Sequence, residues 1–296
     1  MQLCSMTSMF FMQRGTSQKT TVSESLRRHK ALGFSALDLN LCAMQRHESE
    51  FNQDDWQQKA CMLREEADKL GLSIIQGHLP FRSSSFRKED AEELMALTLR
   101  ALKICAVAGV KWAVVHPVHD DRFPAEALDE QIAFNQTFYQ PLLELAEQQG
   151  VGLAFENLSD MGPKRRFCAS ASELAALTDR LCGPKIGVCW DFGHANLTYG
   201  SAQTYGLRLI GPKLKALHFA DNLGSRDDHL APFLGQICWE EIMHTLREVN
   251  YQGPLTLEVM QHSYLPEALK DSSMGFLMDI SRYLIQLYEE AGESPC

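Results

Sequence analysis

The chain has 296 residues, of which 45% are hydrophobic and 22% are charged. This composition supplies enough apolar material for a large buried core and lacks the strong charge bias of disordered chains. Lys and Arg number 28 against 38 Asp and Glu, a formal net charge of −10. That balance argues against a protein that gains its affinity by neutralising the phosphate backbone of a nucleic acid.

The nine cysteines include no CxxC pair, and several lie within apolar segments. An odd number of unpaired thiols is typical of a reducing compartment, so we expect a cytoplasmic protein without disulfide bonds. No segment approaches the roughly 18 consecutive apolar residues that span a membrane. The amino-terminal segment lacks a basic region and a small-residue cleavage site, so we interpret it as a buried strand rather than a signal peptide.

Eight short apolar segments recur at intervals of 30 to 40 residues along the chain. In order they are Leu3–Met12, Ala36–Cys42, Ser73–His78, Trp112–Val118, Gly152–Asn157, Ile186–Trp190, Ala216–Ala220 and Leu255–Met260. Their continuous rather than alternating apolar character is typical of parallel strands that are covered on both faces.

Amphipathic segments that end close to a glycine lie between these strands and are predicted to be helices. They include Asp54–Leu70, Lys88–Ala108, Leu128–Gln149 and Ser170–Leu181. Strands alternating with helices over this length predict an α/β protein with a single (β/α)8 TIM barrel domain over residues 1–296. A doubly wound sheet is the structural alternative, but no GxGxxG or GxxxxGK[ST] motif supports it.

Polar residues close six consecutive predicted strands, from the third to the eighth. They are His78, His116, Glu156 with Asn157, Asp191 with His194, His218 and Glu258. A single such residue is usually an ordinary rim residue, but the active site of a TIM barrel lies at the carboxyl ends of its strands. Six converging there would repel one another or lack partners without a cation. Mixed nitrogen and oxygen donors favour Mn²⁺, Co²⁺ or Zn²⁺, and the residues alone do not choose among them.

Seven motifs are similar to those of the xylose-isomerase-like TIM barrel superfamily of sugar isomerases, epimerases and inosose dehydratases, which also contains the type IV apurinic/apyrimidinic (AP) endonucleases. They are His78-Leu-Pro, His116-Pro, Phe155-Glu156-Asn157, Asp191-Phe-Gly-His194-Ala-Asn196, His218-Phe-Ala-Asp221, Asp227-Asp-His229 and Glu258. The resemblance implies a metal ion bound by Glu156, Asp191, His218 and Glu258. We expect Mn²⁺, with Co²⁺, Zn²⁺ or Mg²⁺ as alternatives.

The same resemblance implies roles for the remaining polar residues. His78, His116, His194, Asp227 and His229 match further metal ligands of the type IV endonucleases, although sugar isomerases often keep several of these histidines as substrate contacts. The predicted substrate contacts are His78, His116, Asn157, His194 and Arg226. Members of the superfamily are often dimers or tetramers, so homo-oligomer formation stays open.

The favoured interpretation is a metal-dependent isomerase or epimerase of a sugar, sugar phosphate or keto-polyol, which moves a proton through a metal-stabilised enediolate. Glu156 and Glu258 come from the fifth and eighth strands and would face each other across the mouth, so they are the predicted catalytic acid and base. We expect a small carbohydrate substrate and no nucleic-acid or membrane partner.

Two other enzyme classes remain open. A metal-cluster phosphodiesterase of the type IV AP endonuclease kind is favoured by the full set of matching ligands and opposed by the net charge. A dehydratase or lyase on the same scaffold would share the carbon-acid chemistry. The basic segment Lys164-Arg165-Arg166 follows the fifth strand and is either a solvated loop or a site for an anionic substrate. Asp38 closes the second strand and either orients a ligand histidine or satisfies a turn.

Overall fold

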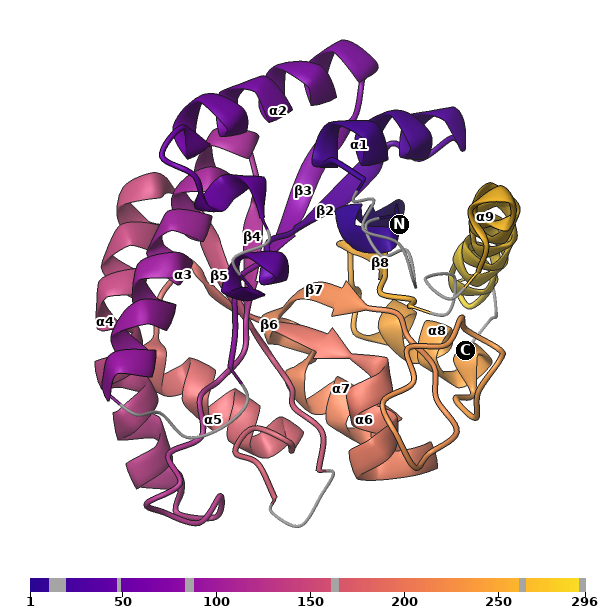
Figure 1. The fold of residues 1–296 in the computed structure, drawn as a ribbon. Helices are drawn as coiled ribbons and strands as arrows, with labels where there is room; N and C mark the ends of the chain where they lie inside the picture. Colours follow the sequence, from indigo (N-terminus) through magenta and orange to yellow (C-terminus); the bar gives the residue numbers. More distant parts are fainter. Residues whose placement is uncertain (11–19, 47–48, 83–87, 161–164, 261–264, 293–296) are drawn as a thin grey trace.

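The computed structural model describes residues 1–10, 20–46, 49–82, 88–160, 165–260 and 265–292, and within these ranges eight parallel strands alternate with helices (Figure 1). The strands are β1 Gln2–Met6, β2 Ala36–Asn40, β3 Ser73–His78, β4 Trp112–Val115, β5 Gly152–Glu156, β6 Ile186–Asp191, β7 Leu214–His218 and β8 Pro254–Leu257. The α-helices are α1 Val22–Ala31, α2 Trp56–Leu70, α3 Lys88–Ala108, α4 Leu128–Gln149, α5 Ala171–Leu181, α6 Phe192–Tyr199, α7 Gln203–Ile210, α8 Trp239–Glu248 and α9 Glu267–Glu290. Short 3-10 turns lie at Thr7–Phe10, Cys42–Arg46, Glu50–Asn52, Gly200–Ala202 and Gly211–Lys213.

The strands follow one another around the sheet in the order β7-β6-β5-β4-β3-β2-β1-β8. Closure is made just beyond the end of β7, where Phe219 pairs in parallel with Leu257. The Phe219 amide donates to the Thr256 carbonyl at 2.8 Å, and the Phe219 carbonyl accepts from the Glu258 amide at 3.1 Å. The predicted (β/α)8 barrel is confirmed.

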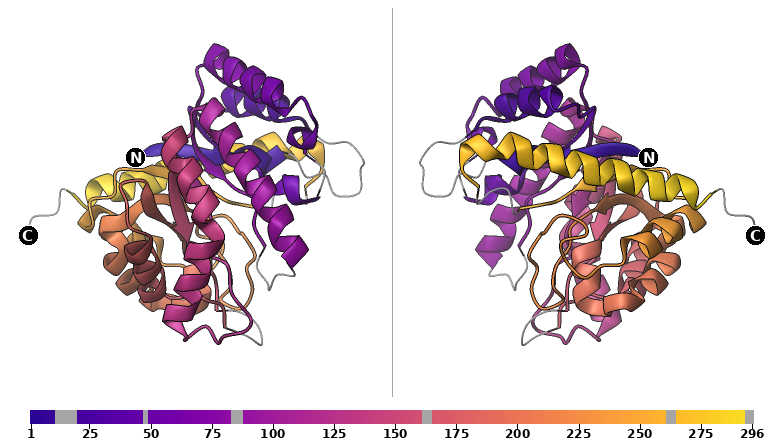
Figure 2. Two further views of the ribbon diagram at one scale, coloured as in Figure 1. Left: turned by 90° about the vertical axis from the view of Figure 1, so that its left-hand side faces the viewer. Right: turned by 90° about the vertical axis from the view of Figure 1, so that its right-hand side faces the viewer.

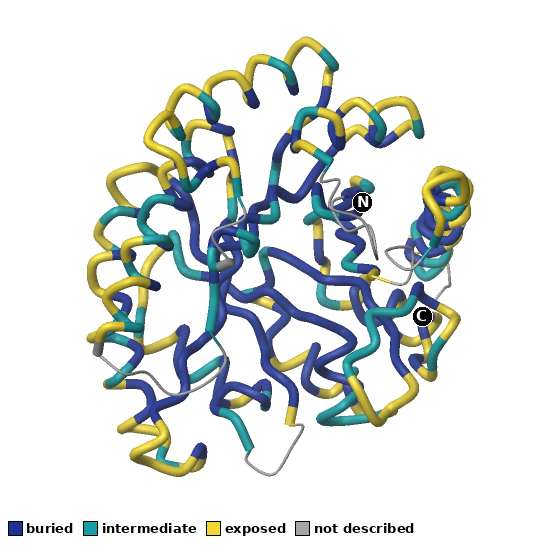
Figure 3. Tube along the Cα trace, in the orientation of Figure 1, coloured by how far each residue is buried: buried dark blue, intermediate teal, exposed yellow. Residues whose placement is uncertain are grey.

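The barrel strands are buried along most of their length (Figure 3). Their two faces pack into different apolar clusters, which explains why the strand sequences are continuously apolar. Side chains that face outward, such as Leu37, Phe155 and Trp190, join the large core between strands and helices. A separate, smaller cluster occupies the barrel interior and consists of Val114, Ala154, Cys189 and Ala216 with Trp112 packed against it. Two positions further along these four strands the residues are polar: His116, Glu156, Asp191 and His218.

Local capping sets where several helices begin and end. Gly71 and Gly150 follow α2 and α4 in the left-handed conformation, with φ of 63° and 70°, which glycine adopts without steric cost. Ser170 and Glu173 form a reciprocal capping box at the start of α5. The carboxyl-terminal helix α9 runs along the outside of the barrel (Figure 2), where Asp271 forms an ion pair of 2.6 Å with Arg28 of α1.

The predicted first strand, Leu3–Met12, is wrong at its carboxyl end. β1 stops at Met6, and Thr7–Phe10 forms a 3-10 turn, whereas residues 11 and 12 lie outside the described ranges. Two hydrogen bonds hold Thr7 where the chain leaves the sheet. Thr7 Oγ1 accepts from the Asn40 amide at 3.0 Å, and the Thr7 carbonyl accepts from Ser25 Oγ at 2.6 Å.

Other predicted boundaries differ by a few residues. β4 ends before His116, because the following Pro117 has no N–H for a sheet ladder. The predicted strands ending at Cys42, Asn157, Ala220 and Met260 end in the structure at Asn40, Glu156, His218 and Leu257. The sixth strand extends one residue further, to Asp191, the seventh begins at Leu214, and α2 begins at Trp56.

Candidate metal centre

The polar residues that close the strands reach one rim because side chains alternate between the two faces of a strand. Each follows an interior residue by two positions, in the pairs Gln76 and His78, Val114 and His116, Ala154 and Glu156, Cys189 and Asp191, Ala216 and His218, Thr256 and Glu258. The register places Glu156 opposite Cys189 and Asp191 opposite His218. The structure therefore brings these side chains together at the carboxyl end of the barrel.

Three carboxylates surround one imidazole nitrogen at the centre of this rim. His218 Nδ1 lies 2.9 Å from Glu258 Oε2, 3.2 Å from Glu156 Oε1 and 4.0 Å from Asp191 Oδ2. One ligand atom from each of these four residues lies within 4.8 Å of the others. Asp191 Oδ2 is buried and accepts no hydrogen bond from any residue in the described part of the chain. A buried oxygen without a partner, within a set of three carboxylates and a histidine, fits a divalent cation.

The electrostatics of the four-residue group, Glu156, Asp191, His218 and Glu258, also favour a bound cation. Burial raises the pKa of Asp191 to about 7. The nearby carboxylates of Glu258 and Glu156 also raise this pKa, whereas His194 acts to lower it. Burial also acts to raise the pKa of Glu258, but His218 outweighs it and lowers that pKa to about 2. The group therefore lacks enough positive charge to hold all three carboxylates ionised at neutral pH, and a cation would supply it.

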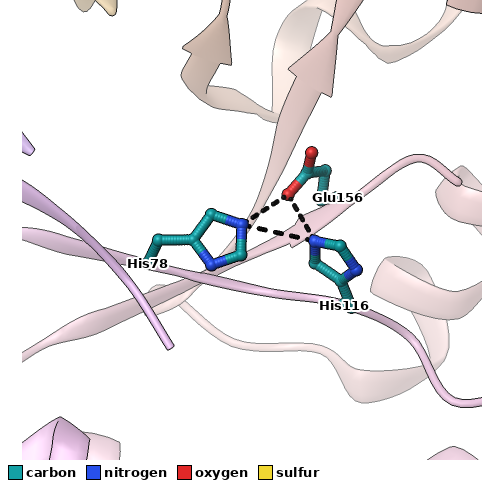
Figure 4. A group of neighbouring side chains, drawn as sticks. All are labelled: His78, His116 and Glu156. Atoms are coloured by element: carbon teal, nitrogen blue, oxygen red, sulfur yellow. Dashed lines mark hydrogen bonds and ion pairs between the residues drawn. The ribbon is translucent and has the colours of Figure 1, made fainter. Parts of the chain in front are cut away.

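A second group shares Glu156 with the first, and Figure 4 shows its three side chains, His78, His116 and Glu156. Glu156 Oε2 lies 3.0 Å from His116 Nε2 and 3.4 Å from His78 Nε2, and the two Nε2 atoms are 3.3 Å apart. The Leu79 carbonyl lies 3.0 Å from His78 Nδ1 and orients that ring. Burial lowers the pKa of His116 to about 4, so this imidazole is neutral and suited to binding a metal ion.

A third group is built from α6 and the loop after β7. Asp227 Oδ2 lies 3.3 Å from His194 Nε2 and 3.1 Å from His229 Nε2. Burial acts to lower the pKa values of both histidines, but neighbouring carboxylates, with Asp227 among them, outweigh it and raise each to about 10. His194 Nδ1 lies 3.6 Å from Glu156 Oε1, so this group adjoins the other two.

Asn157 and Arg226 lie differently from the other predicted site residues. The Asn157 amide accepts from the Asp191 N–H at 2.7 Å and donates to the Asp191 carbonyl at 3.0 Å, which fixes the backbone of that residue. The Asp191 carboxylate in turn caps α6 by accepting from the His194 amide at 2.6 Å. Arg226 is exposed and pairs with Asp228 at 2.6 Å, so the structure does not bring it together with the three groups.

Sequence reasoning missed three residues that contact the rim. Gln76 Nε2 lies 3.1 Å from His218 Nε2, and Cys42 Sγ lies 3.1 Å from His78 Nδ1. Cys189 Sγ approaches Glu156 and His218, but burial raises the pKa of this thiol to about 12, so it stays protonated. The alternation along β3 and β6 could have identified Gln76 and Cys189, whereas nothing local signals Cys42.

No helix in the described ranges is long and apolar enough to cross a membrane. A family model described as "Xylose isomerase-like TIM barrel" matches residues 26–280. A D-psicose 3-epimerase of Enterocloster bolteae is 24% identical over 254 residues, which cover 81% of this chain and 78% of that protein.

Two further similarities say less about function. An uncharacterized protein of Sinorhizobium fredii is 36% identical over 167 residues, and the match spans 55% of this chain but only about half, 52%, of that relative. The crystal structure of a D-tagatose 3-epimerase-like protein is similar with a TM-score of 0.76 at 18% identity, covering 98% of this chain and 99% of that one. This structural similarity concerns the fold.

Proposed function

The chain belongs to the xylose isomerase-like TIM barrel family, and from that membership together with the geometry of its rim we propose that it is a divalent-metal-dependent sugar epimerase or isomerase. One observation carries the proposal: three carboxylates surround Nδ1 of His218 at the end of the barrel where TIM barrel enzymes act. The similarity to a D-psicose 3-epimerase supports a small carbohydrate substrate.

Glu156, Asp191, His218 and Glu258 would hold the cation, which we expect to be Mn²⁺. A bound divalent cation would polarise the substrate carbonyl and stabilise the negative charge that develops on its oxygen. Asn157 would act as a positioning residue, because both polar atoms of its amide are bonded to the Asp191 backbone.

Glu156 and Glu258 would move the proton. One carboxylate takes the proton from the carbon beside the carbonyl. The other glutamate, once it is protonated, returns a proton to the opposite face of that carbon, or to the former carbonyl carbon while the hydroxyl proton of the first carbon passes to the former carbonyl oxygen. The first outcome is epimerisation and the second is aldose–ketose isomerisation. Each glutamate needs one oxygen free toward the substrate, and both lie within reach of the same point beside His218 Nδ1.

His78, His116 and His194 would bind substrate hydroxyl groups from the adjoining two groups. All three are buried at the rim and lie within 3.6 Å of a Glu156 oxygen. The predicted contact of Arg226 with substrate stays a prediction, because that guanidinium is exposed beside Asp228.

A metal-cluster phosphodiesterase is the second candidate. The observation that favours it is the presence of two further histidine–carboxylate groups next to the first, one at His78 and His116 and the other at Asp227. Such a cluster would activate water and stabilise a leaving alkoxide. Metal-dependent nicking of abasic-site duplex DNA by catalytic amounts of protein would favour this function over the epimerase. A dehydratase would begin with the same proton removal and would be recognised by loss of water from the sugar.

The deciding experiment follows carbon-bound hydrogen directly. The protein, supplied with Mn²⁺, is incubated in D₂O with a panel of ketoses and ketose phosphates, and deuterium in the recovered sugars is measured by NMR. We expect incorporation at the carbon beside the carbonyl in at least one sugar. Absence of exchange across the panel with Mn²⁺, Co²⁺ and Zn²⁺ supplied in turn would reject the proposed reaction.

A further inference from the structure

Two adjacent arginines in the loop after β5 have very different surroundings. Arg165 Nη1 lies 2.6 Å from Glu173 Oε1 and 3.6 Å from Glu126 Oε1, so its charge is neutralised within the fold. Arg166 has no carboxylate within ion-pair distance in the described part of the chain, and its Nη2 donates to Ser159 Oγ at 2.9 Å. Lys164, the third member of this basic segment, lies outside the described residues.

Arg166 is held at the rim from two sides. Ser159 is 2% exposed and lies three residues beyond Glu156, so the guanidinium is anchored beside the end of β5. The amide of the next residue, Phe167, donates to Nδ1 of the buried His119 on the loop after β4 at 3.2 Å. These two bonds restrain the side chain of Arg166 and the main chain at the residue that follows it.

Arg166 keeps hydrogen-bond donors that no group in the described part of the protein accepts from. The side chain is partly buried; burial lowers the pKa of its guanidinium, and the Asp227 carboxylate of the third group opposes that effect. A guanidinium carries five N–H donors in a planar fork, and here a serine hydroxyl satisfies one of its nitrogens. Phosphate and carboxylate groups match the remaining donors in pairs.

We propose that Arg166 binds an anionic group of the substrate, a phosphate or a carboxylate at one end of the sugar, while the rest of the sugar lies over the three carboxylates. This inference rests on the proposed function and narrows its substrate class to acidic sugars. Because Arg166 is bonded to Ser159, three residues beyond Glu156, the anion would lie beside the end of β5.

Binding of ligands that cannot react tests the inference without requiring turnover. Titration calorimetry on the Mn²⁺-loaded protein compares D-glucitol with D-glucitol 6-phosphate and D-gluconate, which share the polyol chain and differ in the terminal group. We expect the phosphate or the carboxylate compound to bind at least about tenfold more tightly than D-glucitol, and the preferred compound identifies the natural anion. Arg166→Gln should remove this preference and Arg166→Lys should retain part of it.

Arg165→Gln is the matched control, because it removes a neighbouring charge whose partners are carboxylates of the protein. It should keep the preference for the anion even if it lowers stability. Equal binding of all three ligands by the wild-type protein, or a preference that survives Arg166→Gln, would overturn the inference. If no sugar exchanges deuterium but binding still depends on Arg166, the anion site stands and only the proposed reaction is rejected.

Discussion

His218 and Asp38 connect the rim to the interior of the barrel: Nε2 of the histidine lies 3.7 Å from Oδ2 of the buried aspartate. The other nitrogen, Nδ1, faces the three carboxylates of the four-residue group. A histidine that binds a cation through Nδ1 must carry its proton on Nε2, and the Asp38 carboxylate lies at ion-pair distance on that side, where it favours the protonated nitrogen.

We therefore expect Asp38→Asn to weaken Mn²⁺ binding about tenfold, because partners of this kind fix the tautomer and orientation of a metal-binding histidine. Gln76, which donates to Asp38 Oδ2 at 2.6 Å, keeps a partner of similar shape, so the fold should be retained. Titration calorimetry measures the affinity, and Asp279→Asn on the exposed face of α9 is the control. Unchanged affinity would show that Asp38 has only a packing role.

Glu156→Gln and Glu258→Gln should each lower the rate of deuterium exchange by about 10²- to 10⁴-fold, the usual contribution of an acid or base in proton transfer. The amide retains the size of the side chain but can neither accept nor return the proton. Exchange is measured by NMR alongside circular dichroism, and Glu65→Gln on exposed α2 serves as the control. Exchange at nearly the wild-type rate in both variants would remove these glutamates from the mechanism.

Removal of divalent metal by a chelator should lower the melting temperature as well as the activity. A ligand at 100 times its Kd stabilises the native state by about 2.7 kcal/mol, which for a chain of this length corresponds to a shift of about 4 °C. The reason is that the cation binds the assembled carboxylates and not the unfolded chain. Differential scanning calorimetry before and after chelation, with Mn²⁺ restored in a third sample, makes the comparison. Three coincident transitions would contradict the expectation.

Asp221 should be among the most costly aspartates to replace. Its buried carboxylate accepts from the amides of Asn222, Phe233 and Ile237 and from Trp239 Nε1, at 2.8 to 3.2 Å. Asp221→Asn puts an N–H₂ group among four donors and should cost about 3 kcal/mol of unfolding free energy, since bonds to a buried charge are worth more than neutral ones. Urea denaturation measures the loss.

The same substitution should also slow catalysis, because the segment that Asp221 organises carries Asp227 and His229. Arg282→Gln, which breaks an exposed ion pair within α9, should leave both stability and activity nearly unchanged. A wild-type denaturation midpoint for Asp221→Asn would mean that the four bonds contribute little.

Much of the architecture is readable from the sequence because parallel strands buried on both faces have a distinctive composition. The helices Lys88–Ala108 and Leu128–Gln149 begin and end as predicted, since periodicity and terminal glycines are local signals. The convergence of the rim residues also follows from local information: each comes at or just beyond the end of a strand in a fold whose strand ends meet.

The remaining features depend on contacts between distant parts of the chain. The early end of β1 is set by bonds from Thr7 to Asn40 and Ser25, which no local pattern reveals. The sequence gives no reason to distinguish the adjacent residues Arg165 and Arg166. In the structure Arg165 forms an ion pair with Glu173, whereas Arg166 is hydrogen-bonded to Ser159. Pairing of this kind is decided by tertiary structure.

The most direct test of the metal centre is calorimetric titration of the stripped protein with Mn²⁺, with Asp191→Asn and His218→Ala as variants. We expect saturable binding by the wild-type chain and a large loss of affinity in both variants, with deuterium exchange returning as Mn²⁺ is added. A stripped protein that binds no Mn²⁺, Co²⁺ or Zn²⁺ below about millimolar concentration, and that still exchanges deuterium at full rate, would contradict the proposed cation site.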